Sequence, residues 1–337
     1  DRLQRLTRDQ GSYGEHSFSY DAVGNRLSYT STQGEQEQKE NYRYAPASNR
    51  LLGTSNQEIS LDATGNLLQE SKVKHSWETA QSSPVVTEPG QSQGGFTLPA
   101  TAERSYSYNG HNRISEYHEN GKLKARYHYN ALGQRIHKAV IQPDGREQHT
   151  LFHYGQNGEL LSEIQLDSIE ASTNGQSQNI VWLQMRPVVA LDSGQQASEA
   201  NNNSQITWLH SDHLLTARMA TDSDQNLIWR WHSDAFGVGK AESLTANGTV
   251  NNDEAAFAFN LRFPGQYYDA ENGLHYNYFR TYDPQQGRYT QSDPIGLMGG
   301  VNTFAYVGGS PLMNLDETGL IAWTGKVTSV GVSLGGG

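Results

Sequence analysis

One repeated unit constrains the fold of this chain more than any other feature. The unit reads aromatic–x–aromatic, then Asp or Asn, two residues, Gly, Asn or Gln, Arg, and Leu or Ile. Internal repeats at such a period indicate a stacked array. The copies, most of them about 17–25 residues apart, are FSYDAVGNRL (18–27), YRYAPASNRLL (42–52), ISLDATGNLL (59–68), YSYNGHNRI (106–114), YHYNALGQRI (127–136) and FHYGQNGELL (152–161).

Each unit predicts a β-hairpin. Side chains alternate along a strand, so the two aromatic rings lie on the same face. The Asp or Asn side chain starts a turn, and Gly24, Gly65 and Gly133 supply the positive φ that a tight hairpin requires. A single hairpin is marginally stable in water, whereas stacked hairpins bury a continuous aromatic stripe. We therefore predict an all-β chain of laterally stacked hairpins, with aromatic rings that serve packing rather than sugar binding.

Composition supports this fold and excludes several functions. The 34 Gly and 18 Tyr favour many short strands joined by tight turns, and LLTARMA (214–220) is the best short helical candidate. A net charge of −11 argues against a nucleic-acid surface. The absence of Cys excludes disulfides and thiolate metal sites. No run approaches the roughly 20 apolar residues of a membrane helix, and no signal peptide precedes DRLQRLTRDQ, where the repeat pattern is already under way. We therefore expect a fragment of a longer protein.

Two Asp-x-x-Gly-Leu units mark the last part of the chain. Asp293 opens one and Asp316 the other, and polar sequence gives way to Gly-rich apolar sequence at Leu320–Ile321. Two carboxylates that share one proton can hydrolyse a peptide, because the ionised one activates water while the protonated one polarises the carbonyl. Asp-Pro-x-Gly is also a good β-turn sequence. Both a cleavage dyad and a pair of turn residues stay open on this pattern.

Two longer segments carry a resemblance to a known family. The repeats resemble YD repeats, WLHSDHLLTARMATDSDQNLIWRWHSDAFG (208–237) resembles the opening of the RHS-associated core, and RFPGQYYDAENGLHYNYFRTYDPQQGRYTQSDPIGL (262–297) is similar to the rest of that core. The resemblance to RHS/YD-repeat toxins, which are related to the C component of Tc toxins, runs from about residue 18 to Leu320. It implies a sheet that spirals into a hollow shell around a C-terminal toxin, closed at one end by the core.

The same resemblance implies a site. Asp293 and Asp316 match the two aspartates that the family uses for autoproteolysis, and Arg280 matches an arginine that is also needed. We therefore expect a single-turnover aspartic peptidase that cuts its own chain between Leu320 and Ile321. Glu317 stands where the family has Pro, so we expect slower cleavage than is typical.

The resemblance also predicts the organisation and the partners of the chain. Residues 1–205 would form the repeat shell with a loop insertion at 71–104, residues 206–320 the core, and residues 321–337 the start of the toxin. The partners would be the enclosed toxin, a secretion spike or other delivery component, and an immunity protein. The protein would be a secreted or delivered bacterial effector, of the type VI kind used in interbacterial competition.

We expect no cofactor, no metal and no contact of the shell with nucleic acid. His210, Asp212 and His213 in HSDH are close enough in sequence to suggest a metal site, but without convergent further ligands a hydrogen-bonded structural role is favoured. The alternative to the toxin hypothesis is a non-cleaving structural or carbohydrate-binding repeat protein of the cell surface.

Overall fold

A computed structural model describes residues 1–72, 103–168, 175–193, 205–253 and 256–324. These residues contain no α-helix, and their only helical segments are the short 3-10 turns η3 (Gly296–Gly299) and η4 (Val307–Gly309). Nineteen strands form one sheet. Each strand pairs antiparallel with the next one along the chain. The predicted all-β fold of laterally stacked hairpins is confirmed.

The strands of this sheet are β1 (Arg8–Gly11), β2 (Gly14–Tyr20), β3 (Arg26–Gln33), β4 (Gln36–Tyr44), β5 (Leu51–Thr54), β6 (Gln57–Leu61), β7 (Leu67–Lys72), β8 (Arg104–Tyr108), β9 (Ile114–Glu119), β10 (Lys122–Tyr129), β11 (Arg135–Ile141), β12 (Glu147–Tyr154), β13 (Leu160–Leu166), β14 (Gln176–Leu183), β15 (Arg186–Ser193), β16 (Gln205–Ser211), β17 (Ala217–Thr221), β18 (Leu227–Trp231) and β19 (Ala241–Ser243).

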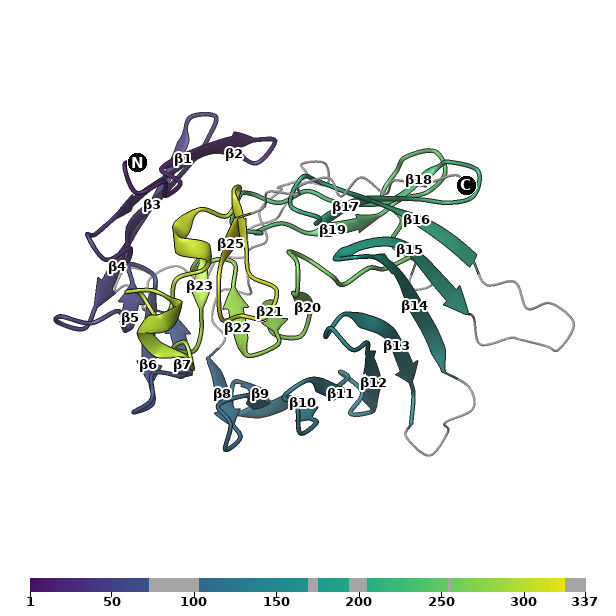
Figure 1. Ribbon diagram of the computed structural model, residues 1–337, viewed down its shortest axis with the longest axis horizontal. Helices are drawn as coiled ribbons and strands as arrows, with labels where there is room; N and C mark the ends of the chain where they lie inside the picture. Colours follow the sequence, from purple (N-terminus) through teal and green to yellow (C-terminus); the bar gives the residue numbers. More distant parts are fainter. Residues whose placement is uncertain (73–102, 169–174, 194–204, 254–255, 325–337) are drawn as a thin grey trace, which may run out of the picture.

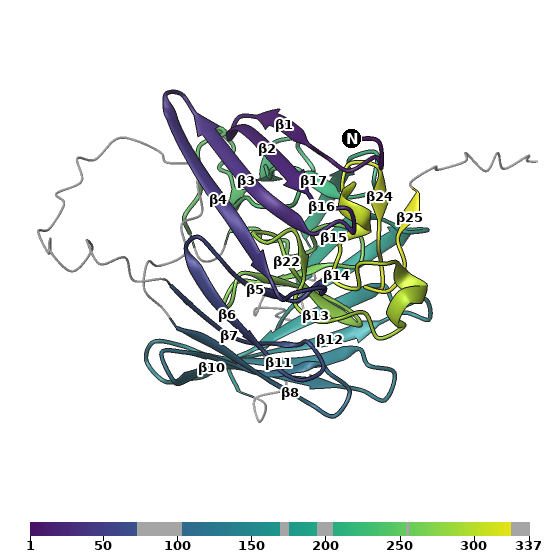
Figure 2. The same ribbon diagram turned by 90° about the vertical axis from the view of Figure 1, so that its left-hand side faces the viewer.

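The large sheet curves around a central module, as Figures 1 and 2 show. That module holds a four-stranded antiparallel sheet of β20 (Tyr267–Asp269), β21 (Leu274–Asn277), β22 (Arg280–Asp283) and β23 (Arg288–Tyr289). A small hairpin-like pair, β24 (Asn314–Leu315) and β25 (Trp323–Thr324), follows it. The core lies between the concave face of the large sheet and this module, because the inward aromatic residues of both pack together.

The hairpin turns follow the predicted chemistry. Asp21 Oδ1 accepts hydrogen bonds from the backbone N–H groups of Val23 and Asn25, at 3.0 and 2.8 Å. Gly24 has a φ of 88° and Gly133 a φ of 83°, as the tight turn requires. In the units that carry both residues, the turn is therefore fixed locally by the Asp or Asn and the Gly.

The helical interpretation of residues 214–220 is wrong. Asp212 Oδ1 accepts from the N–H groups of Leu214 and Thr216, so this stretch begins with the same turn as the repeats. Leu215 has a φ of 66°, which a helix does not permit. The remainder is β17, whose pairing with β16 overrides its weak helical pattern.

The two aromatic positions of each unit have different tasks. The first ring faces the interior and is buried, as at Phe18, Tyr106 and Tyr127, which confirms the predicted packing role. The second is Tyr, and its hydroxyl donates to a backbone carbonyl of the preceding hairpin at 2.7–3.0 Å. These bonds run from Tyr20 to Leu6, Tyr44 to Arg26, Tyr108 to Leu67, Tyr129 to Ile114 and Tyr154 to Arg135. The hydroxyl explains why Phe appears only at the first position of these copies.

The arginines of the repeats attach the large sheet to the central module. Arg135 donates two hydrogen bonds to the carboxylate of Asp269 in β20, at 2.6 and 2.9 Å, and both side chains are buried. Arg113 lies over the ring of Phe279 at 4.8 Å. Arg26 Nη1 donates to the backbone carbonyl of Gln285, between β22 and β23, at 3.3 Å. Arginines of three repeats therefore contact the module that carries the candidate site.

Some predictions fall partly outside the described residues. Most of the insertion at 71–104 and most of the segment 321–337 lie there. The large sheet continues through β19, beyond residue 205, and the ranges 1–205 and 206–320 stay predictions. Within the described residues, no helix is long and apolar enough to cross a membrane.

Candidate functional site

The candidate site is built around a buried arginine. Arg280 begins β22 in the four-stranded sheet, and only 3% of it is exposed. Its Nη2 lies 3.0 Å from Asp293 Oδ2 and 3.4 Å from Asp316 Oδ2. The structure therefore brings together the three residues that the sequence and the family resemblance singled out.

Asp293 follows β23 and opens a turn. Its backbone carbonyl accepts from the N–H of Gly296 at 2.9 Å, and its Oδ1 accepts from the N–H of Ile295 at 3.0 Å. The predicted Asp-Pro-x-Gly turn is thus present. Because the turn uses only Oδ1, Oδ2 remains for Arg280.

Asp316 follows β24, and its two carboxylate oxygens are used in the same way. Its Oδ1 accepts from the N–H groups of Gly319 and Leu320, at 2.8 and 3.0 Å. Its Oδ2 faces Arg280 and accepts a hydrogen bond from the hydroxyl of Tyr289 at 2.8 Å. In both Asp-x-x-Gly-Leu units, one carboxylate oxygen builds the turn and the other points at the shared guanidinium.

The candidate scissile bond lies directly against this cluster. The backbone N–H of Leu320 donates a hydrogen bond to Asp316 Oδ1. The backbone carbonyl of Gly319 accepts a hydrogen bond from Nε of Arg280. Beyond Leu320 the chain returns along β24, where Leu315 pairs with Trp323. Ile321 lies in the loop between these strands and is 47% exposed. The Leu320–Ile321 bond is thus held in a loop anchored on both sides.

Electrostatics distinguishes the acidic groups. Asp293 is 7% exposed and Asp316 is 2% exposed. Burial raises the pKa of Asp293, and the charge of Asp316 raises it further, while Arg280 opposes both effects. Burial and the charge of Asp316 also raise the pKa of Glu317, the residue at the position where the family has Pro. Asp293 accordingly retains a proton to higher pH than an ordinary aspartate does.

Sequence reasoning did not find several residues that complete the cluster. Tyr289 lies under the guanidinium of Arg280, with its ring centroid 3.7 Å from Cζ, and burial raises its pKa. Asn277 Nδ2 donates to the hydroxyl of Tyr289 at 2.8 Å and to the backbone carbonyl of Asp316 at 2.9 Å. Thr303 accepts from Arg280 Nη1 through its carbonyl, at 3.1 Å. The sequence contains no local signal for these contacts, because the residues come from separate turns and strands.

The HSDH segment makes structural hydrogen bonds. His213 Nε2 lies 2.9 Å from the carbonyl of Leu312, and His210 Nε2 lies 3.0 Å from Thr221 Oγ1. Asp212 caps its turn and pairs with Arg218 at 2.9 Å. All three side chains of this segment therefore take part in polar contacts within the fold. The described residues contain no group of three His, Cys, Asp or Glu side chains placed to hold a metal ion.

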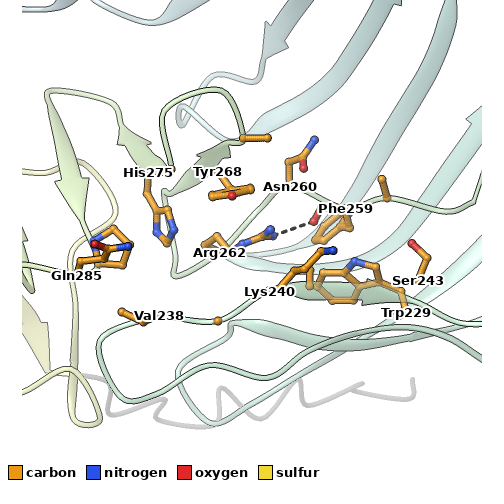
Figure 3. A pocket seen from close by; sticks show the side chains of 17 residues that line it. Trp229, Val238, Lys240, Ser243, Phe259, Asn260, Arg262, Tyr268, His275 and Gln285 are labelled. Atoms are coloured by element: carbon orange, nitrogen blue, oxygen red, sulfur yellow. Dashed lines mark hydrogen bonds between the residues drawn. The ribbon is translucent and has the colours of Figure 1, made fainter. Parts of the chain in front are cut away.

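A cavity of about 360 Å³ lies elsewhere, between β18–β19 and the four-stranded sheet, and Figure 3 shows its lining. Arg262 crosses it and donates to the carbonyl of Phe259 at 2.8 Å. Burial lowers the pKa of Arg262 to about 10. None of Arg280, Asp293 and Asp316 lines this cavity, so it is separate from the carboxylate cluster.

Comparisons with known proteins relate the chain to bacterial toxins. No protein-family model matches it. It is 32% identical over 238 residues to the toxin protein Tse5 of Pseudomonas aeruginosa, and the matched region covers 64% of this chain and 17% of Tse5. It is 25% identical over 335 residues to double-stranded DNA deaminase toxin A of Burkholderia cenocepacia, covering 90% of this chain and 22% of the toxin. It is 24% identical to the tRNA3(Ser)-specific nuclease WapA of Bacillus spizizenii, covering 96% of this chain and 11% of WapA.

A solved structure of the Photorhabdus luminescens Tc holotoxin pore matches 94% of this chain and 18% of its own chain, with a TM-score of 0.38 and 15% identity. The chain therefore spans less than a quarter of each of these relatives. The relationship to the three toxins rests on sequence, and the stacked repeat sheet agrees with it. These similarities support the resemblance of the chain to RHS/YD-repeat toxins.

Proposed function

We propose that this chain is the part of an RHS toxin that encloses a C-terminal toxin and releases it by cutting its own backbone between Leu320 and Ile321. One observation carries the proposal: the carboxylates of Asp293 and Asp316 converge on one guanidinium beside the Leu320 peptide. Each aspartate already has a turn to build, and neither turn needs the second oxygen. Two buried acidic side chains directed at one cation are costly for a purely structural turn, which favours a catalytic purpose.

The chemistry follows from the separate environments of the two carboxylates. Asp293, whose pKa burial raises, is the proposed proton donor to the carbonyl oxygen of Leu320, since its Oδ2 and that oxygen both lie beside Gly299. Asp316 takes a proton from the water molecule that attacks the carbonyl carbon. Arg280 and the Tyr289 hydroxyl stabilise the negative charge on Asp316. When the tetrahedral intermediate collapses, Asp316 passes its proton to the nitrogen of Ile321 and Asp293 recovers a proton from a hydroxyl of the intermediate. The C–N bond breaks, Ile321 leaves as an amine and Leu320 keeps a new carboxyl group.

The cut is made once per molecule. The substrate is part of the same chain, so proximity replaces substrate binding. In this proposal residues 1–205 form the shell wall, residues 206–320 the core that cuts, and residues after Leu320 the cargo. The curved sheet around the central module supports an enclosing role. A delivery component and an immunity protein for the released toxin complete the proposed set of partners, and the protein acts as a delivered effector.

The experiment is fragment release from the full-length protein that carries this chain. Wild-type protein is expected to yield a fragment whose first residue, by N-terminal sequencing and intact mass, is Ile321. Asp293→Asn and Asp316→Asn are each expected to abolish release, because an amide retains the shape but neither donates nor accepts the required proton. Both variants are expected to remain folded.

A matched control uses a turn aspartate outside the site. Asp21 caps the same kind of Asp-x-x-Gly turn in the first repeat, so Asp21→Asn makes an equal chemical change without touching Arg280. It is expected to release the fragment normally. Release from either dyad variant at the wild-type rate would remove that aspartate from the mechanism. A wild-type chain that stays intact at every pH would favour a non-cleaving structural protein, and glycan binding by that chain would favour the carbohydrate-binding alternative.

A further inference from the structure

A glycine lies at the meeting point of the proposed acid and the proposed scissile carbonyl. Gly299 ends η3, the short turn that follows Asp293. A Cβ atom built on Gly299 would lie 2.3 Å from Asp293 Oδ2 and 2.9 Å from the carbonyl oxygen of Leu320. Both oxygens therefore approach one small volume, which is free because residue 299 has no side chain.

The backbone at this position does not by itself require glycine. Gly296 and Gly300, in the same loop, have φ values of 61° and 132°, where a side chain is strained. Gly299 is not among the residues with positive φ. At Gly296 and Gly300 an added Cβ would meet nothing within 4 Å. The constraint on residue 299 is thus steric, and the atoms it protects are those of the proposed reaction.

We propose that Gly299 is a positioning residue for self-cleavage, whose missing side chain lets the carboxyl of Asp293 reach the carbonyl of Leu320. This inference rests on the proposed function. An added methyl group must displace either the Asp293 side chain or the Leu320 peptide. The carboxylate is the end of a side chain, so it can move without a shift of the backbone, and it moves away from both the carbonyl and Arg280.

The test compares Gly299→Ala with Gly300→Ala in the full-length protein. Gly299→Ala is expected to slow release of the Ile321 fragment at least tenfold per folded molecule, with a loss of stability no larger than that of Asp293→Asn, which weakens the same ion pair with Arg280. Gly300→Ala strains the same loop but adds its methyl group in open space, so its cleavage rate is expected to stay within about threefold of wild type. The difference between the variants isolates the steric effect from loop strain.

A pH profile adds a readout that a structural role alone would not change. If Gly299→Ala moves Asp293 away from Arg280, the influence that lowers the pKa of Asp293 is lost, and its pKa rises further. The alkaline limb of the residual cleavage is then expected to move to higher pH. An unchanged limb with an unchanged rate would overturn the inference.

The outcomes separate this inference from the proposed function. Wild-type cleavage that is lost in Asp293→Asn but retained in Gly299→Ala would refute the role of Gly299 alone. Equal slowing by Gly299→Ala and Gly300→Ala would also refute it, because strain in the loop would then explain both. Absence of cleavage in the wild type would contradict the proposed function itself.

Discussion

Replacement of Arg280 by alanine is the sharpest test of the cluster. The guanidinium is almost fully buried and contacts both carboxylates, the carbonyls of Gly319 and Thr303, and the ring of Tyr289. Removing one partner from a buried ion pair costs about 3–5 kcal/mol. Because one carboxyl can take up a proton and relieve the repulsion, we expect the lower end, about 3 kcal/mol.

The effect on cleavage is expected to be separate from this loss of stability. Loss of one positioned electrostatic group in a buried site slows a reaction by about 10²–10³-fold. Arg280→Lys is expected to recover roughly tenfold of that loss, because an ammonium retains the charge but lacks the planar fork that spans two carboxylates. The assay is a time course of Ile321 fragment release from purified, initially uncleaved protein, with unfolding measured in parallel.

Arg262 provides the matched control. It is a buried arginine of the same module, bonded to the carbonyls of Phe259 and Leu261 and placed over the rings of Trp231 and Tyr268. Arg262→Ala is expected to lower stability but to leave the cleavage rate per folded molecule unchanged. Wild-type cleavage by Arg280→Ala at every pH would refute the reasoning and leave Arg280 with a packing role only.

Three further predictions follow from the same contacts. Cleavage needs the proton on Asp293, so the rate of release should fall as pH rises through the raised pKa of that carboxyl. In Arg280→Ala the charge that lowers this pKa is lost, so a pH–rate series should show the fall in rate at higher pH than in the wild type. A fall at lower pH would contradict the assignment of the proton to Asp293. Tyr289→Phe removes a hydrogen bond to a charged group, worth about 1.5–3 kcal/mol, and should slow release roughly tenfold or more with the fold intact by circular dichroism; an unchanged rate would exclude the hydroxyl. Asp269→Asn removes the buried negative charge that pairs with Arg135 and Lys138, and it should lower the free energy of unfolding in denaturant by about 3–5 kcal/mol. As a control, Asp144→Asn breaks an exposed ion pair with Arg146 and should not change the stability measurably. Burial alone would raise the pKa of Asp269, but Arg135 and Lys138 lower it overall, so its contribution is present above the unfolded-state pKa of about 4 and is lost as pH falls below it.

The local structure was predictable from the sequence because its causes are local. Where an Asp or Asn is followed by Gly three positions later, the turn is fixed through bonds that span four residues, as at Asp21 and Gly24. The alternation of aromatic and polar residues then sets which face is buried. Even the tyrosine at the second aromatic position had a visible signal, since that position is Tyr in all five copies that carry two aromatic residues.

The candidate site was likewise predictable only where its causes are local. The sequence by itself determined that Asp293 and Asp316 each build an Asp-x-x-Gly turn beside a change in composition, and the family resemblance added Arg280. Only the tertiary structure decided that the free oxygens of both turns meet at one guanidinium, that Tyr289 and Asn277 support Asp316, and that Gly299 borders the Leu320 carbonyl. A turn depends on residues that are neighbours in the sequence. These contacts instead join β22, β23, η3 and the loop after β24, and the relative positions of those elements depend on how the central module packs as a whole.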